Sequence, residues 1–361
     1  MNTKFIVASF LPIYPVTFGS SVVISSFFES IPSKNKTLFQ ISAQKRIKNR
    51  NIVSTIPLLN NYILKFIAVI FLIKKVLIKI YSSKLKNILI IEGASWIGYT
   101  FILVLLVKIL FPKVKIIYRG HSIEYEIRKN NSNFIITNLS FLFEKYVYKN
   151  VDCATSVSSI EKNKIKKLYN VKTYVYPNII LFKKFKKKLN FKYKYIFYSG
   201  SYEYLPNKIV IDRLVKKIMP SLLSYYPNLK LVITGGKKLP YNYKWIKTFG
   251  LVSKSKYISL LKNSVCLAIP SNEGYGTRVK IIEALCYGAI VVSSKIGIEG
   301  IEFNKKIIPP FNCDTDKNFI RVISSIIKDK KFKKIAQKNT SKFIEYYSAK
   351  FQNKKFLKEI L

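Results

Sequence analysis

The chain has 361 residues, of which 49% are hydrophobic and 14% aromatic, so it can bury the cores of about two domains. This composition excludes a mainly disordered chain, and 13 Gly and 13 Pro exclude a collagen-like one. Four Cys without a Cys-x-x-Cys pair and a single His argue against a disulfide framework and against zinc or other His-rich metal sites. The same Cys usage fits a reducing compartment.

The charge is strongly positive, because 63 Lys and Arg against 18 Asp and Glu give a formal net charge of +45. Such a surface attracts nucleic acid, anionic lipid or phosphorylated substrates. Only seven of the basic residues are Arg, however, and the Lys residues are spread along the whole chain. Proteins that read bases usually rely on Arg, and no zinc finger, RNA-binding sheet signature or basic zipper occurs. We therefore attribute the charge mainly to composition and expect no specific nucleic-acid partner.

The first half of the chain alternates between segments of strand and helix character. Residues 4–10 are as apolar as a signal peptide, but Pro12 and Pro15 interrupt the run and no small-residue cleavage site follows. They predict instead the first buried strand of a parallel sheet, and Gly19-Ser20-Ser21 marks a strand–loop–helix junction. Further strands are expected at 88–91, 114–118, 154–157 and 173–176, and helices around 101–107 and over 159–169.

Two apolar runs, 66–73 and 101–107, raise the question of a membrane. Both are well short of the roughly 20 residues that a membrane-spanning helix needs. The second lies between two predicted strands, so we expect it to pack on a sheet as the helix of a βαβ unit. The first is followed by Lys74, Lys75 and Lys79. Two alternatives stay open for it: a helix in the core, or a helix lying on an anionic bilayer surface.

A Lys-rich run over 183–188 predicts a solvated linker between two domains. A second alternating series follows it, and two such series imply an α/β protein with two doubly wound domains that bind ligands at the carboxyl ends of their strands. Strands are expected at 195–198, 229–234, 265–270 and 289–292, and helices at 209–219 (ended by Pro220), 257–261, 279–287 and 317–328. We place the domains at 1–182 and 183–340, followed by a C-terminal helix at 341–361 that could return to the first domain.

The stretch 271–288 leads from a predicted strand into a predicted helix and reads SNEGYGTRVKIIEALCYG. Glycines let the backbone approach a ligand, and a helix N-terminus offers free N–H groups and a positive dipole. Arg278 and Lys280 add positive charge there, so a diphosphate is the expected ligand. Glu283 lies about a turn and a half further on, where it could accept hydrogen bonds from ribose hydroxyls. The alternative is a Gly-rich turn with surface charges.

This stretch resembles the donor-binding segment of family-4 glycosyltransferases, which are retaining enzymes of the GT-B fold. It is similar to the subgroup that has Gly-x-Gly-Thr-Arg-x-Lys-x-x-Glu, followed by the Gly-x-Glu-Gly seen here at 297–300. The commonest family form has two Glu with seven residues between them, whereas Glu273 and Glu283 have nine between them.

Other segments resemble the same family in the expected order. Residues 198–207 resemble the opening of its donor domain, and residues 118–126 resemble its His-Asn-x-Glu-Tyr-Glu loop, with Ser122 in the Asn place. Residues 157–178 resemble its Val-Ser…Pro-Asn-Gly passage, and Gly19-Ser20 takes the position of a Gly-Gly loop. The resemblance spans nearly the whole chain and implies a GT-B fold, in which two Rossmann-like domains face a cleft.

The resemblance also implies roles for individual residues. His121, the only His in the chain, would lie at a strand's carboxyl end facing the cleft, where it would orient the donor or stabilise an oxocarbenium-like transition state. Glu273 would be the second catalytic residue, and Gly19, Ser20 and Glu124 would lie on the acceptor side. The implied donor-binding residues are Gly200, Ser201, Asn207, Gly235, Gly276, Thr277, Arg278, Lys280 and Glu283.

The resulting interpretation is a cytoplasmic glycosyltransferase that moves a sugar, with retention, from a nucleotide-sugar to a glycan or lipid-linked acceptor. It would need no cofactor and no metal, and it could contact the inner face of the cell membrane peripherally. One alternative is a basic membrane-surface binding protein without catalysis, which the net charge and residues 62–81 would support. Another is a different GT-B enzyme, such as a phosphorylase or an epimerase.

Overall fold

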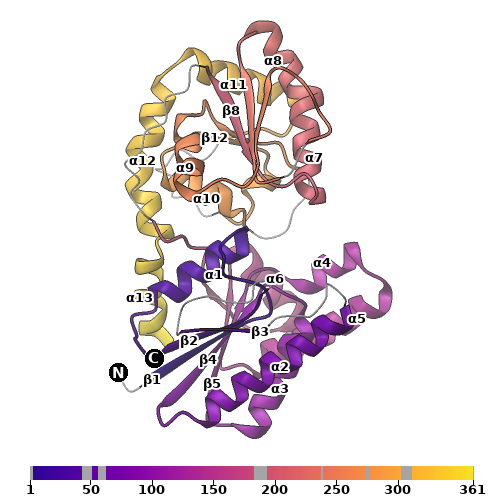
Figure 1. The fold of residues 1–361 in the computed structure, drawn as a ribbon, viewed down its shortest axis with the longest axis vertical. Helices are drawn as coiled ribbons and strands as arrows, with labels where there is room; N and C mark the ends of the chain where they lie inside the picture. Colours follow the sequence, from indigo (N-terminus) through magenta and orange to yellow (C-terminus); the bar gives the residue numbers. More distant parts are fainter. Residues whose placement is uncertain are drawn as a thin grey trace. The chain divides into compact units, whose positions relative to one another are not determined.

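The computed structural model describes residues 3–42, 51–55, 62–182, 193–236, 239–272, 277–301 and 311–360. Contacts within the chain divide it into two compact units, shown in Figure 1. Unit 1 contains Met1–Leu181 and Ala349–Leu361, and unit 2 contains Phe182–Ser348. Each unit is built on its own parallel sheet. The predicted linker at 183–188 lies outside the described residues.

The sheet of unit 1 has seven parallel strands in the order β3-β2-β1-β4-β5-β6-β7. Its central residues, such as Ile6, Leu89 and Ile117, are fully buried, as is usual where helices cover both faces of a parallel sheet. The order reverses between β1 and β4, so their carboxyl ends form the switch point at which such folds bind ligands. The strands are β1 (Thr3–Ser9), β2 (Lys36–Ile41), β3 (Ile52–Thr55), β4 (Lys86–Gly93), β5 (Lys115–Gly120), β6 (Cys153–Ser156) and β7 (Tyr174–Val175).

Helices cover both faces of this sheet (Figure 1). One face packs against α2, α3, α5 and α6, and the other against α1 and α13. The ring centroids of Phe27 on α1 and Phe356 on α13 lie 6.5 Å apart, so the last helix of the chain completes the core of unit 1. The helices are α1 (Gly19–Ser30), α2 (Tyr62–Tyr81), α3 (Ile97–Leu110), α4 (Glu124–Asn131), α5 (Phe134–Asn150), α6 (Ser159–Tyr169) and α13 (Ala349–Ile360).

The run 66–73 lies within helix α2, and only part of it is buried in the core of unit 1. Val69 and Leu72 are buried in the core of unit 1, whereas Ile70 and Phe71 are about half exposed, at 50% and 54%. The run 101–107 lies within α3 and packs on the sheet, as predicted. Within the described part of the chain, the helices are too short or too polar to cross a membrane.

The sheet of unit 2 has six parallel strands in the order β10-β9-β8-β11-β12-β13. Here the order reverses between β8 and β11, which places the second switch point at the carboxyl ends of these two strands. The strands are β8 (Tyr195–Ser199), β9 (Lys230–Thr234), β10 (Ile246–Phe249), β11 (Leu267–Ile269), β12 (Val291–Ser293) and β13 (Phe311–Asn312).

The helices of unit 2 differ from the prediction at two places. The helix expected to end at Pro220 begins earlier than predicted, and helical structure continues beyond that residue. A π-helical turn, η1, precedes Pro220, which therefore lies in the first turn of a new helix. The missing N–H of proline costs little at that position. Two helices stand where one was expected over 341–361. The first is the last part of α12, the second is α13, and Ser348 separates them. The helical elements are α7 (Leu205–Arg213), η1 (Leu214–Ile218), α8 (Met219–Tyr225), α9 (Lys254–Asn263), α10 (Val279–Cys286), η2 (Ile296–Ile298), α11 (Asp316–Lys328) and α12 (Lys331–Tyr347).

Candidate active-site residues

The backbone at the carboxyl ends of β8 and β9 is closely packed and rich in glycine. The N–H of Gly200 donates to the Thr234 carbonyl at 2.8 Å, and that of Gly235 donates to the Gly250 carbonyl at 3.0 Å. Gly235 has φ +98°, which L side chains rarely adopt, and a Cβ on Gly200 would lie 2.5 Å from Cγ of Asn207. These positions require glycine, and they leave backbone without side chains at the switch point of unit 2.

Lys280, in the first turn of α10, reaches across to this backbone. Its Nζ donates to the Ser199 carbonyl at 2.6 Å and lies 3.2 Å from Asn207 Oδ1. Asn207 is itself fixed, because Tyr198 Oη donates to its Oδ1 at 2.8 Å and its Nδ2 donates to the Ser201 carbonyl at 3.1 Å. Burial, and then repulsion from Arg278, lowers the pKa of Lys280 to about 7. The structure thus brings five of the predicted donor-binding residues together: Gly200, Ser201, Asn207, Gly235 and Lys280.

Arg278 stands at the N-cap position of α10, immediately after Thr277. Its Nη2 donates to Ser271 Oγ at 2.7 Å, just beyond the end of β11, and burial lowers its pKa. Two cationic side chains and the N-terminus of α10 therefore lie on the β11 side of the switch point, an arrangement suited to an anion. Gly276 and Glu273 lie outside the described residues.

Glu283, expected at the ribose, is buried with only 6% of its surface exposed. Its carboxylate forms an ion pair with Lys254 Nζ, at the beginning of α9. Lys254 was not predicted as a partner of Glu283, because nothing in the spacing of the two residues shows that α9 and α10 bring them together. The carboxylate of Glu283 already has a cationic partner, and a ribose would compete with or join that contact.

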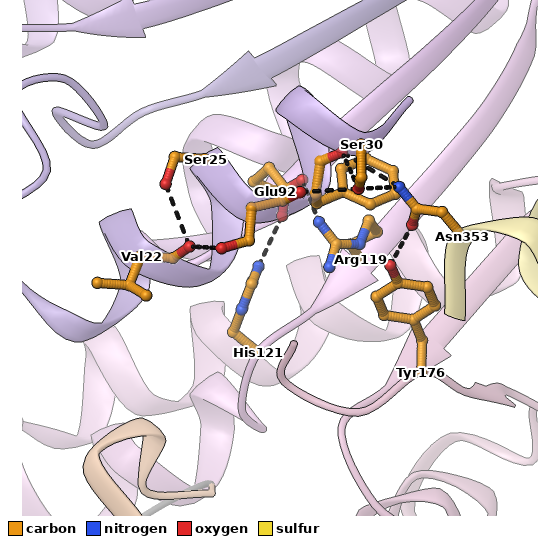
Figure 2. A network of polar contacts seen from close by, with 10 residues as sticks. Val22, Ser25, Ser30, Glu92, Arg119, His121, Tyr176 and Asn353 are labelled. Carbon is orange, nitrogen blue, oxygen red and sulfur yellow. Dashed lines mark hydrogen bonds and ion pairs between the residues drawn. The ribbon is translucent and has the colours of Figure 1, made fainter. Parts of the chain in front are cut away.

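In unit 1, His121 belongs to a buried network at the ends of β4 and β5 (Figure 2). Its Nε2 lies 2.6 Å from Glu92 Oε2, and the other oxygen, Oε1, accepts from Arg119 Nη1 at 2.5 Å. Glu92 has no exposed surface. Burial alone would raise its pKa, but Arg119 and His121 outweigh burial and hold the pKa below its ordinary value. Glu92 is therefore ionised and serves two donors at once.

Sequence reasoning missed Glu92, although a signal for it exists. It follows four apolar residues, Ile88 to Ile91, at the end of a predicted buried strand, where an ionisable side chain needs a partner. The partners could not be predicted, because Arg119 and His121 become neighbours only when β4 and β5 pair in the sheet.

The remaining residues predicted on the acceptor side have mainly local roles. Gly19 and Ser20 form the first turn of α1. Glu124 Oε1 accepts from Arg128 Nε at 2.6 Å within α4. The N-terminus of α4 is capped by Glu144, which accepts from the N–H groups of Glu124 and Tyr125, both at 2.9 Å. Among the described residues, no group of three or more His, Cys, Asp or Glu could hold a metal ion.

Comparison with known proteins adds to this geometry. Residues 193–329 match the family model described as glycosyl transferases group 1. The match covers less than half of the chain and shows that this part is similar to group 1 glycosyltransferases. The match covers the switch point of unit 2 and all the donor-side residues described above. A search of curated proteins found no match.

Solved structures resemble the chain over its whole length. Sucrose-phosphate synthase from Thermosynechococcus elongatus is 13% identical, with 99% of each chain covered and a TM-score of 0.74. Anabaena HepE in complex with UDP and glucose is 11% identical, with 99% of each chain covered and a TM-score of 0.69. The trehalose-6-phosphate synthase OtsA is 10% identical, with 99% of this chain and 98% of that chain covered and a TM-score of 0.73. These likenesses show a GT-B-like fold with two parallel sheets.

Proposed function

We propose that unit 2 binds a nucleoside-diphosphate sugar and that the chain transfers its hexose, with retention, to a glycan or lipid-linked acceptor recognised by unit 1. The observation that carries the proposal is the placement of Lys280 and Arg278 beside the glycine backbone at the switch point of unit 2. Uridine diphosphate is the first nucleotide to test, because HepE was solved with UDP and with UDP-glucose. The finer assignment to the family-4 subgroup remains part of this proposal.

The proposed chemistry follows from charge. As the bond between the anomeric carbon and the diphosphate breaks, positive charge develops on the sugar and negative charge on the leaving group. Arg278 and the N-terminus of α10 are positive groups held in place before the reaction, so they would stabilise the leaving diphosphate without a cost of rearrangement. Lys280 would add its charge once the bound diphosphate favours its protonated form. His121 would act on the sugar side, where Glu92 holds its ring.

We also propose that unit 1 contacts an anionic membrane while it takes its acceptor. Large apolar side chains are exposed on α2 and α5, two helices on the same face of the sheet of unit 1. Aromatic rings of α3 lie between these helices, where one packs against Phe66 of α2 and another against Phe143 of α5. Lys74 and Lys75 are exposed beside them. The exposed large apolar residues are Ile63, Phe66, Ile67, Ile70, Phe71, Ile78 and Tyr81 on α2, and Phe134, Ile135, Ile136, Leu139 and Leu142 on α5. Exposed apolar side chains next to lysines favour binding at the surface of an anionic bilayer, where acyl chains and negatively charged headgroups meet.

Arg278→Ala tests the donor site. A charge-assisted hydrogen bond to phosphate contributes about 1.5–3 kcal/mol, so the substitution should weaken UDP binding roughly tenfold or more. Titration calorimetry measures the affinity, and circular dichroism checks that the variant is folded. Arg321→Ala, which removes an exposed arginine from α11 in the same unit, is the matched control and should bind UDP as the wild type does. An unchanged affinity in Arg278→Ala would contradict the proposed site.

A further inference from the structure

We propose that Glu92 is a positioning residue, which fixes the imidazole proton on Nε2 of His121 and so makes Nδ1 the nitrogen that faces the reaction. The inference rests on the proposed function and names a residue that neither the donor loop nor the group 1 match contains, because residue 92 lies outside 193–329.

The sheet brings the three groups together. In the register of β4 and β5, Glu92 is paired with Arg119, and His121 follows directly after β5. The two carboxylate oxygens of Glu92 point at different partners: Oε1 at Arg119 Nη1, 2.5 Å away, and Oε2 at His121 Nε2, 2.6 Å away. Figure 2 shows His121 and Arg119 approaching Glu92 from different directions.

The proton position follows from what each group can do. Arg119 can only donate, and an ionised carboxylate can only accept. Nε2 of His121 must therefore carry a proton to make its short contact with Glu92. In the neutral ring Nδ1 then has no proton and can accept one or receive a hydrogen bond. Because the buried Glu92 carboxylate occupies Nε2, Nδ1 is the ring nitrogen that is left to meet a substrate.

Arg119 is held in place independently of His121. Its guanidinium lies 3.8 Å from the ring centroid of Phe27 and 4.7 Å from that of Tyr176. Tyr176 in turn donates its hydroxyl hydrogen bond to Asn353 of α13 (Figure 2). Because this framework keeps the guanidinium against Oε1, the group at position 92 must always offer an acceptor on that side.

This requirement makes Glu92→Gln a sharp probe. The amide has nearly the same shape as the carboxylate, but it has one accepting oxygen and one donating NH2 group. Its oxygen must face Arg119, since NH2 against a guanidinium would place two donors together. The NH2 group then faces His121 Nε2, which must become an acceptor. The proton is thereby forced onto Nδ1, and the face of the ring that meets the substrate changes from acceptor to donor.

The experiment uses the fact that the chain has one His. In 15N-labelled protein at a pH where the ring is neutral, nitrogen chemical shifts report which nitrogen carries the proton. We expect Nε2–H in the wild type and in Glu92→Asp, and Nδ1–H in Glu92→Gln. Turnover of the nucleotide-sugar should fall roughly 10²–10⁴-fold in Glu92→Gln, as when an amide replaces the carboxylate behind another enzyme's histidine, with little change in donor KM.

Glu144→Gln is the matched control, because Glu144 is also a buried carboxylate of unit 1 but accepts hydrogen bonds from Glu124, Tyr125 and Tyr169. It should leave the tautomer and turnover unchanged. The proposal is overturned if the wild-type ring carries its proton on Nδ1. This measurement uses the wild-type protein alone and so does not depend on whether a variant folds. The proposal is also overturned if Glu92→Gln keeps Nε2–H, or flips the tautomer and still turns over at the wild-type rate. A wild type that neither binds nor consumes any nucleotide-sugar would instead refute the proposed function.

Discussion

At the scale of single residues, the buried position of Lys280 gives its amine a lower pKa than an exposed lysine has. Its Nζ is surrounded by the Ser199 carbonyl, Asn207 and the Tyr198 hydroxyl, and burial lowers its pKa to about 7. Above that pH the free protein holds much of Lys280 as the neutral amine. A bound diphosphate favours the charged form, so binding and protonation of this residue are linked.

We therefore expect UDP to bind more weakly as the pH rises from 7.5 to 9, with uptake of up to about one proton per UDP. The sign follows because the free amine has lost its proton above pH 7 and must regain one to pair with the anion. Calorimetry in two buffers of different ionisation enthalpy measures the uptake. Lys280→Met should abolish it, whereas Lys208→Met, which removes an exposed lysine of α7, should not. Proton uptake that persists in Lys280→Met would assign it to another group.

The sequence was sufficient where a motif resembles a known family and insufficient where two residues meet only through the pairing of strands or the packing of helices. Gly200, Asn207 and Lys280 were predicted at a donor site and do lie together in unit 2. Glu92, Glu144 and Lys254 were not predicted, since each meets its partner only through tertiary packing. No spacing along the chain indicates that residue 92 will touch residue 121.

At the scale of elements, most apolar strands were predicted, whereas the buried strand β2 and the capped helix α5 were not. The helix expected over 159–169 matches α6, because Ser158 at its N-cap accepts from the Glu161 N–H and Asn170 ends it in the left-handed region. The sequence analysis did not predict β10, whose Lys247 and Thr248 are exposed at the sheet edge and give no apolar run. The packing of α13 in unit 1 depends on contacts with α1, which is more than 300 residues away in the sequence.

Helix α13 gives a prediction at this scale. Asn353 is buried and joins three groups of unit 1: Tyr176 Oη donates to its Oδ1, and its Nδ2 donates to the Phe27 carbonyl and to Ser30 Oγ. Asn353→Ala leaves these groups without their partner, which should lower the free energy of unfolding by about 1–3 kcal/mol. Urea unfolding measures it. Lys355→Ala, an exposed position on the same helix, should change stability little. Equal stability of the two variants would show that apolar packing alone holds α13.

At the scale of the whole molecule, the net charge of +45 does not by itself identify a partner. A positive protein binds anionic vesicles through charge alone, and salt weakens that binding because the Debye length shortens. The exposed apolar side chains of α2 and α5 add a contribution that salt does not remove. The two contributions can be separated experimentally. The contribution of charge comes from lysines spread over the whole chain, whereas the apolar contribution comes from particular residues that can be substituted.

A variant that combines Ile70→Ser with Phe71→Ser, two half-exposed side chains of α2, separates the apolar contribution from the contribution of charge. Fully burying a large apolar side chain contributes about 1.5–3 kcal/mol, and these two are partly covered already. We therefore expect roughly tenfold weaker co-sedimentation with phosphatidylglycerol vesicles at 0.15 M salt, where surface charges are screened beyond about 8 Å. Tyr225→Ser, which removes an exposed ring from unit 2, keeps the same net charge and should bind as the wild type does. Equal binding of the α2 variant would leave charge as the sole cause, and a wild type that does not bind these vesicles would refute the membrane contact.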